Sequence, residues 1–244
     1  MLEGASSVKE LEFKSSVDIV TNIDKAVESF IKQELTAKYP LFEFLGEEEA
    51  SDNGEDLSDK PTWVVDPIDG TTNFVHNVKF SAVSIALVVE KKAVIGAVYN
   101  PYMNDLYHAY KGNGAFLNDT KIKTSSTSSI ADALIHTNVG YDRTPEGVTF
   151  MMANLQRLML KNVRSVRMGG SAALELCRVA EGKADAFYEF GIHSWDIAAA
   201  CCIIEEAGGK TVDVSGSKLD LLARRVLGGA SGLVDELASV LHVP

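Results

Sequence analysis

The spacing of apolar residues predicts a helix near the start of the chain. Apolar residues recur every three or four positions between residues 24 and 38, as expected for a helix with one buried face. That face would carry Val27, Phe30, Ile31 and Leu35. A short extended segment at 17–20 precedes the helix, Thr21 or Asn22 is the candidate N-cap, and Pro40 ends the helix.

The stretch between residues 46 and 110 predicts a loop followed by a sheet. Residues 46–61 are acidic and have no apolar period, which is typical of a surface loop. A short buried strand follows at Trp63–Val65. Three strand-like runs come next, separated by Lys-Lys, Asn-Pro and Gly-Asn-Gly, and they predict an antiparallel meander. These runs span residues 81–89, 93–99 and 106–110.

Helices and strands alternate in the remainder of the chain. We expect helices at 145–161, 171–181 and 197–207, and a last helix capped by Ser231. The apolar stripe of the first of them is Val148, Met151, Met152, Leu155 and Leu158. The expected strands are 184–190, 210–214 and 226–228.

The organisation of the chain predicts one domain. The sequence has no internal repeat, no low-complexity stretch and no linker loose enough to separate independent units. Its 244 residues fit one large domain or two tightly joined halves. We therefore expect a single domain over residues 1–244, with two tightly packed halves of approximately 1–163 and 164–244.

The charge of the chain restricts its partners. The formal net charge is −11, and a surface this acidic would repel nucleic acid phosphates and anionic membranes, so neither is expected to bind. Clustered carboxylates can also hold hard cations, which would cancel part of the charge. Composition alone does not separate that interpretation from simple solubility, since 46% hydrophobic and 23% charged residues are ordinary for a globular protein.

The cysteines and the N-terminus indicate a cytoplasmic protein. No spacing suggests a zinc site or a disulfide framework, so we expect reduced thiols packed in the core. The cysteines are Cys177, Cys201 and Cys202. No apolar run reaches the length of a membrane span, and the first residues lack the basic and apolar segments of a secretory signal.

Segment 66–72, Asp-Pro-Ile-Asp-Gly-Thr-Thr, is the strongest local indication of chemistry. A buried strand brings Asp66 to its end, and the proline and glycine turn the chain so that Asp69 points into the same space. Two carboxylates and the Ile68 carbonyl can flank divalent cations. The backbone N–H groups after Asp69 begin a helical turn, which favours a phosphate. The alternative interpretation is an Asx-type turn with two solvated aspartates.

Three other acidic residues are ambiguous by themselves. Asp196 begins a nearly apolar helix and is interpretable as a helix cap or as a metal ligand. Glu189 lies seven residues earlier at the end of a strand, and together with His193 could form an ordinary polar loop. Glu47, in a Gly-Glu-Glu-Glu run, could complete a cation site or belong to an acidic surface loop.

Together these segments resemble the inositol monophosphatase family over nearly the whole chain. The two long motifs, 63–74 and 189–196, are specific. Shorter segments match in the same order: Lys14-Ser15-Ser16, Val20-Thr21-x-x-Asp24, Gly46-Glu47-Glu48, Gly170-Ser171-Ala172-Ala173 and Glu206-Ala207-Gly208-Gly209. The resemblance implies a layered α/β fold with alternating helix and sheet layers, a homodimer, and a magnesium-dependent, lithium-sensitive phosphatase for inositol monophosphate.

The resemblance also implies two to three magnesium ions per active site. The first would take Glu47, Asp66 and the carbonyl of Ile68. The second would take Asp66, Asp69 and Asp196. A third, weaker ion would be held by Glu47 through waters.

Further roles follow from the same resemblance. Thr71, hydrogen-bonded to Asp24, would help Glu47 to deprotonate and orient the attacking water. The substrate-binding residues would be Asp69, Gly70, Thr71, Gly170, Ser171, Ala172, Glu189 and Asp196. Phosphate monoester hydrolysis depends mainly on positioning and charge neutralisation, so no Ser, Cys or His nucleophile is required, and His193 is not the expected base.

Two alternatives remain open, and the chain departs from the family at one end. Residues 1–13 are too few and too poorly patterned for the family's first helix, which we expect to be truncated, and segment 14–24 is about one residue short and lacks a proline. One alternative substrate is fructose 1,6-bisphosphate, histidinol phosphate or a 3′-phosphonucleotide, but segment 189–196 favours the inositol type and no added basic cluster is visible. The other alternative is a non-catalytic isoform that regulates through dimers, against which the intact carboxylate set argues.

Overall fold

The computed structural model describes residues 1, 11–13 and 19–243. Lys14, Ser15 and Ser16, and the first half of the extended segment at 17–20, lie outside the described residues. The described chain begins with a two-stranded antiparallel pair, β1 (Leu11–Phe13) and β2 (Ile19–Thr21).

A seven-stranded sheet forms the first layer of strands. Its order follows the sequence from β3 to β9; β3 is parallel to β4, and all later neighbours are antiparallel. The strands are β3 (Glu43–Gly46), β4 (Thr62–Asp69), β5 (Ala82–Val89), β6 (Lys92–Asn100), β7 (Asp105–Tyr110), β8 (Ala115–Leu117) and β9 (Thr120–Ile122). The predicted meander is confirmed, and the predicted strand at Trp63–Val65 continues to Asp69.

A five-stranded sheet forms the second layer of strands, in the order β11-β10-β12-β14-β13. The strands are β10 (Leu134–Thr137), β11 (Ser165–Arg167), β12 (Ala186–Phe190), β13 (Lys210–Val212) and β14 (Arg225–Gly229). Strand β10 is parallel to both of its neighbours, whereas β14 is antiparallel to β12 and β13. Because β10 precedes residue 164, this sheet takes strands from both of the predicted halves.

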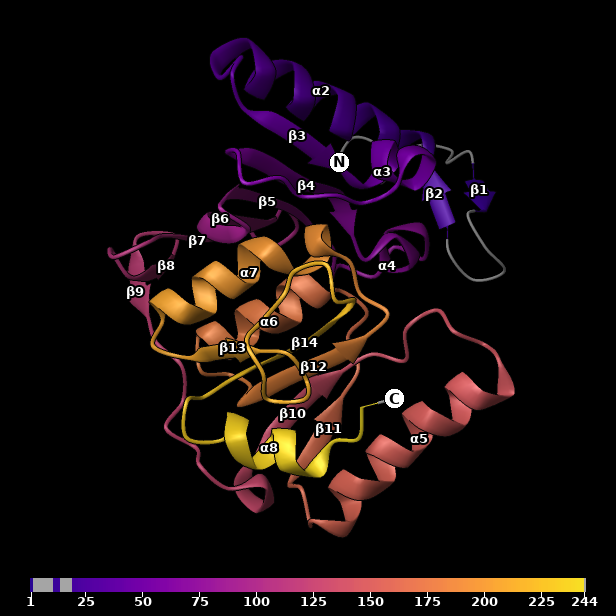
Figure 1. Ribbon diagram of the computed structural model, residues 1–244, viewed down its shortest axis with the longest axis vertical. Helices are drawn as coiled ribbons and strands as arrows, with labels where there is room; N and C mark the ends of the chain where they lie inside the picture. The colour runs from indigo at the N-terminus through magenta and orange to yellow at the C-terminus, as the bar shows by residue number, and fades with distance from the viewer. Residues whose placement is uncertain (2–10, 14–18, 244) are drawn as a thin grey trace.

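The helices separate and cover the two sheets (Figure 1). They are α2 (Asn22–Lys38), α3 (Glu47–Asn53), α4 (Thr71–Val75), α5 (Pro145–Leu160), α6 (Ala172–Ala180), α7 (Ser194–Glu206) and α8 (Val234–Val240), with a 3-10 turn at Ile130–Asp132. Helices α6 and α7 lie between the sheets, α2 lies beyond the first sheet, and α5 and α8 lie beyond the second. The predicted layered α/β fold is thereby confirmed. Among the described residues, no helix combines the length and apolar composition of a membrane span.

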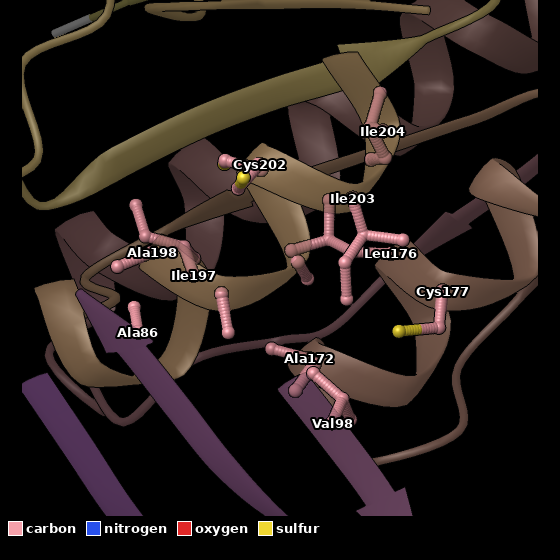
Figure 2. Packing of buried hydrophobic residues seen from close by; sticks show 14 of the residues in the cluster. Ala86, Val98, Ala172, Leu176, Cys177, Ile197, Ala198, Cys202, Ile203 and Ile204 are labelled. Atoms are coloured by element: carbon pink, nitrogen blue, oxygen red, sulfur yellow. The ribbon is translucent and has the colours of Figure 1, made fainter. Parts of the chain in front are cut away.

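The central helix layer forms the main hydrophobic core, shown in Figure 2. Helix α7 packs so closely on β6 that a Cβ at Gly96 would lie 2.2 Å from the carbonyl oxygen of Ala199. Glycine is therefore the residue that permits this approach. All three cysteines are buried free thiols, as the sequence predicted.

The predicted surface loop at 46–61 was wrong over its first half, which forms helix α3. The carboxylate of Glu28, on helix α2, accepts the backbone N–H groups of Glu48 and Glu49 at 2.8 and 3.0 Å. This carboxylate supplies the cap that Gly46, the N-cap residue, lacks. The cap comes from a distant helix, so no local period could reveal it.

Three other local predictions also require correction. Helix α2 begins after Thr21 as predicted, but it buries the polar residues Asp24 and Glu28, while Phe30 is 64% exposed in an open apolar groove. On α5 the buried residues include Asn154 with Leu158, and the two stripe residues Val148 and Met152 are exposed. The last helix begins after Leu233, and the Ser231 hydroxyl donates to the carbonyl of Gly208 instead of capping it. Tertiary contacts outweigh apolar periodicity on α2 and α5, and they outweigh local capping preference at Ser231.

Candidate active site

Strand β4 and the turn after it place two aspartates at the same edge of the sheet. The register of β4 against β5 shifts between Asp66 and Asp69, so the strand bulges where the carboxylates lie. Gly70 then adopts a left-handed conformation with φ of 86°, and a Cβ there would lie 2.8 Å from the carbonyl oxygen of Gly170. Glycine alone fits this turn without strain, and it starts helix α4 facing the aspartates.

Asp69 also holds the start of helix α6. Its carboxylate accepts the backbone N–H groups of Ala172 at 3.2 Å and Ala173 at 3.0 Å, and it accepts the hydroxyl of Ser171. Negative charge at a helix N-terminus is favourable. The Ser171 side chain is buried and directed to Asp69, so its hydroxyl acts on the site through that carboxylate.

Helix α7 brings the third aspartate. Asp196 lies in the first turn, three residues after the N-cap His193, and its Oδ2 accepts the backbone N–H of His193 at 2.7 Å. One carboxylate oxygen from each of Asp66, Asp69 and Asp196 lies within 4.8 Å of the others. The capping and ligand interpretations of Asp196 are thus compatible, because the same side chain both reaches back along the helix and faces the cluster.

The electrostatics of this cluster favour a bound cation. Burial raises the pKa of Asp66 well above its usual range, and repulsion from Glu47, Asp69 and Asp196 raises it further. Burial likewise raises the pKa of Asp69 to about 7, despite the hydrogen bonds from α6. Among the described residues, no lysine or arginine forms an ion pair with the three aspartates. Hard carboxylate oxygens gathered without a cationic side chain fit the ligand set of a divalent metal ion such as Mg²⁺.

Asp24 and Thr71 meet beside this cluster. The Thr71 hydroxyl lies 3.2 Å from Oδ1 of Asp24 and 3.0 Å from the carbonyl oxygen of Ile68. Oδ2 of Asp24 accepts the backbone N–H of Thr21 at 3.0 Å and also its hydroxyl. Asp24 is therefore fixed at the start of α2, and it orients Thr71 beside the carbonyl that the turn exposes.

A cavity of about 500 Å³ contains nearly all the predicted site residues. Its lining includes Glu47, Asp66, Ile68, Asp69, Gly70, Thr71, Gly170, Ala172, Glu189 and Asp196. The volume is that of a small-molecule site. Of the remaining predicted residues, Asp24 is linked to the cavity through Thr71, and Ser171 through Asp69.

The structure adds polar residues that sequence reasoning missed. Asn73 donates to the carbonyl oxygens of Phe80 and Gly169, and so ties the turn after β4 to the segment before α6. Glu55 lies 2.9 Å from Nδ1 of His193, and the His193 ring is stacked on Trp195. Asn73 lies within the 63–74 motif, and His193 and Trp195 lie within the 189–196 motif, but the contacts of these residues form only on folding. Glu55 belongs to no motif or period of the sequence.

The fold and the site together define a layered α/β protein with a cluster of carboxylate oxygens that could hold a metal ion. The model of the inositol monophosphatase family matches residues 2–242. An inositol monophosphatase of Dictyostelium discoideum is 47% identical over 236 residues, covering 97% of this chain and 87% of that protein. The chain therefore belongs to the inositol monophosphatase family, a metal-dependent family of phosphatases, and the resemblance seen in the sequence is confirmed.

Solved structures agree with this assignment. The extragenic suppressor protein suhB from Bartonella henselae superposes with a TM-score of 0.88 at 33% identity, covering 98% of this chain and 92% of that one. The inositol monophosphate-bound structure of the Staphylococcus aureus IMPase-II superposes with a TM-score of 0.80 at 33% identity, covering 90% and 84%.

Proposed function

We propose that the protein hydrolyses inositol monophosphate to inositol and phosphate. The observation that carries this proposal is the cluster of Asp66, Asp69 and Asp196 in one cavity with Glu47. The inositol monophosphate-bound relative supports the choice of substrate. The cavity is large enough for such a ligand and is lined by both acidic residues and backbone groups.

Magnesium is the proposed cofactor, with two to three ions per site. Glu47, Asp66 and the Ile68 carbonyl would hold one ion, and Asp66 with Asp69 and Asp196 a second; a third would be held more weakly through Glu47. Bound there, magnesium would acidify the attacking water and neutralise charge on the phosphate and the leaving oxygen. The absence of a cationic side chain among the described partners of these aspartates supports the assignment, because buried carboxylates need compensation.

Glu47, Thr71 and Asp24 are the proposed catalytic residues. Asp24 orients the Thr71 hydroxyl, and Thr71 with Glu47 positions the water for attack on phosphorus. The Glu47 carboxylate accepts the proton that this water loses. The attack occurs in line with the leaving oxygen: the bond from phosphorus to the inositol oxygen breaks as the new bond forms, and the inositol oxygen leaves as the alcohol after taking a proton from water. No covalent enzyme intermediate forms, since transfer to water requires positioning and electrostatic stabilisation rather than a nucleophilic side chain.

The remaining cavity residues bind the substrate in this proposal. The backbone N–H groups of Gly70 and Thr71, at the start of α4, donate to the phosphate. The polyol lies in the same cavity. It contacts Asp69, Gly170, Ala172, Glu189 and Asp196, with Ser171 supporting Asp69.

We also propose the broader properties that the family resemblance implies. The protein would function as a cytoplasmic homodimer and would be inhibited by lithium ions. It would act as a single domain over residues 1–244, its two halves packed through helices α6 and α7.

Phosphate release by the purified protein tests the proposal. We expect turnover of inositol 1-phosphate that requires magnesium, stops with a chelator and is inhibited by lithium. A panel with fructose 1,6-bisphosphate, histidinol phosphate and a 3′-phosphonucleotide should show lower kcat/KM for each. Full activity in chelator would refute the metal mechanism, and no turnover with magnesium would support the non-catalytic alternative.

A further inference from the structure

Asn138, which follows strand β10, lies between two buried glutamates. Its amide nitrogen Nδ2 donates to Oε2 of Glu175 at 2.7 Å and to Oε2 of Glu189 at 3.0 Å. Glu175 is fully buried on α6, and Glu189, at the end of β12, is 8% exposed and lines the cavity. One amide group therefore joins a carboxylate of the core to a carboxylate of the candidate substrate site.

The hydrogen bonds of Asn138 fix the orientation of its amide. The oxygen Oδ1 accepts the backbone N–H of Gly170 at 3.1 Å, so both amide hydrogens and the carbonyl oxygen have partners. The reversed amide would place its oxygen against both carboxylates and its nitrogen against an N–H donor. Only one of the two orientations therefore satisfies the network.

Glu175 gives Asn138 a rigid support. Its Oε1 accepts the backbone N–H of Gly169 at 2.8 Å and lies 3.1 Å from Nδ1 of His136. The support thus includes helix α6, strand β10 and the segment before α6. A side chain held by such a network keeps its rotamer.

Glu189 depends on Asn138 for its position. Among the described residues, Asn138 is the one hydrogen-bond donor that the Glu189 carboxylate has. The terminal torsion of a glutamate is broad unless a partner holds it. The charge of Glu175 would also repel Glu189, and the Asn138 amide lies between the two carboxylates. Without Asn138 the Glu189 carboxylate would lose its hydrogen bond and would no longer be separated from Glu175 by the amide.

We propose that Asn138 is a positioning residue that aims Glu189 at the hydroxyl groups of the substrate and so selects phosphate esters of polyols. This inference rests on the proposed function, in which Glu189 binds the polyol. Glu189 can recognise hydroxyl groups, whereas an ester such as phenyl phosphate offers it no hydroxyl. Asn138 also lines the cavity, but its amide atoms are all engaged by Glu175, Glu189 and Gly170. Asn138 therefore acts on the choice of alcohol through Glu189 and takes no part in the attack on phosphorus.

The test compares Asn138→Ala with wild type on inositol 1-phosphate and on phenyl phosphate, both with magnesium. For inositol 1-phosphate we expect KM to rise about ten-fold and kcat to change less than about two-fold. The lost contact to the polyol would stabilise the bound substrate and the transition state equally, so its loss raises KM alone. For phenyl phosphate we expect kcat/KM to stay within about two-fold. This substrate has no hydroxyl group for Glu189 to bind, so the variant has no hydrogen bond to the charged carboxylate to lose. Equal losses on both substrates, or no loss on either, would overturn the proposal.

A double-mutant cycle with Glu189→Ala separates positioning from a general structural effect. If Asn138 acts through Glu189, adding Asn138→Ala to Glu189→Ala should raise the KM for inositol 1-phosphate less than about two-fold further. A second, independent ten-fold rise would refute the proposal. If Asn138→Ala does not fold, Asn138→Ser keeps a small polar side chain and takes its place in both experiments.

Asn154 provides a matched control. It is a buried asparagine on α5 whose amide bonds the backbone of His242 at 2.7 and 3.2 Å, and it does not line the cavity. Asn154→Ala should lower the melting temperature but leave the ratio of kcat/KM for the two substrates unchanged. A changed ratio would show that loss of any buried asparagine has this effect, and it would overturn the proposal. Failure of the wild type to hydrolyse inositol 1-phosphate would instead refute the proposed function, so the two failures are distinguishable.

Discussion

Replacing Asp196 by asparagine separates its hydrogen bond at the start of helix α7 from its proposed role as a metal ligand. The side chain accepts the His193 N–H at 2.7 Å and also belongs to the cluster with Asp66 and Asp69. An asparagine keeps the size of the side chain and one carbonyl oxygen, so it can preserve the hydrogen bond within the helix. It removes the charge, which a magnesium site needs because a neutral amide oxygen is a weaker ligand for a hard cation.

The geometry gives the scale of both effects. Two ionised carboxylates whose oxygens are no more than 4.8 Å apart repel each other by at least about 3.5 kcal/mol at an effective dielectric constant of about 20. Removing one charge relieves part of this repulsion, so the protein without metal should be no less stable as Asp196→Asn. Losing one strong electrostatic contact to the transition state should lower kcat by at least about 10²-fold.

Two measurements check this prediction. Thermal unfolding in chelator should give Asp196→Asn a melting temperature no lower than wild type, and adding magnesium should stabilise the variant less. Phosphate release should show the fall in kcat. Asp220→Asn is the control, because Asp220 accepts one backbone N–H, from Leu222 at 3.0 Å, and does not line the cavity. If the variant retains more than about a third of wild-type kcat, the activation free energy has changed by less than about 1 kcal/mol. That result would show that Asp196 is only a cap.

Three further predictions concern stability. Burial raises the pKa of Asp69 to about 7 and that of Glu189 to about 8; a carboxyl group with a raised pKa binds more protons when folded, so melting temperatures in chelator should fall from about pH 5 to pH 8, and a flat profile would contradict these shifts. Glu28→Ala should lower the free energy of unfolding by about 0.5–2 kcal/mol, by removing the cap of α3, and should weaken magnesium binding measured by titration; unchanged binding would separate the cap from the site. Gly96→Ala should cost about 3 kcal/mol in urea unfolding, because its Cβ would meet the α7 backbone at 2.2 Å, and a neutral result would contradict that packing.

The elements that the sequence predicted correctly are mostly those in which an apolar run lies between clear turn or helix-ending residues. The meander of β5, β6 and β7 has apolar runs between clear turn residues, and helix α7 is a nearly continuous apolar run closed by two glycines. Such signals are local, and burial between two layers agrees with them. Helix α3 was not predicted, because the residue that caps it, Glu28, lies on another helix.

The candidate site divides in the same way. Asp66, Asp69 and Gly70 could be singled out because one turn holds them in sequence as well as in space. Glu47 and Asp196 were ambiguous until the family resemblance placed them together, since they come from helices far apart in the chain. Asn138 and Glu175 could not be found at all, because a polar residue between two layers has no period and acquires its partners only on folding.

Asp69 shows why metal binding and assembly of this fold should be coupled. The same carboxylate lies at the edge of the first sheet, caps the helix between the sheets and faces the other aspartates. Without a cation its charge is disfavoured by burial and by its neighbours, although the α6 N-terminus stabilises it. A cation that compensates the cluster therefore also strengthens the attachment of α6 to β4. Because a ligand that binds only the folded state stabilises it, the gain from magnesium should be seen in global unfolding as well as in activity.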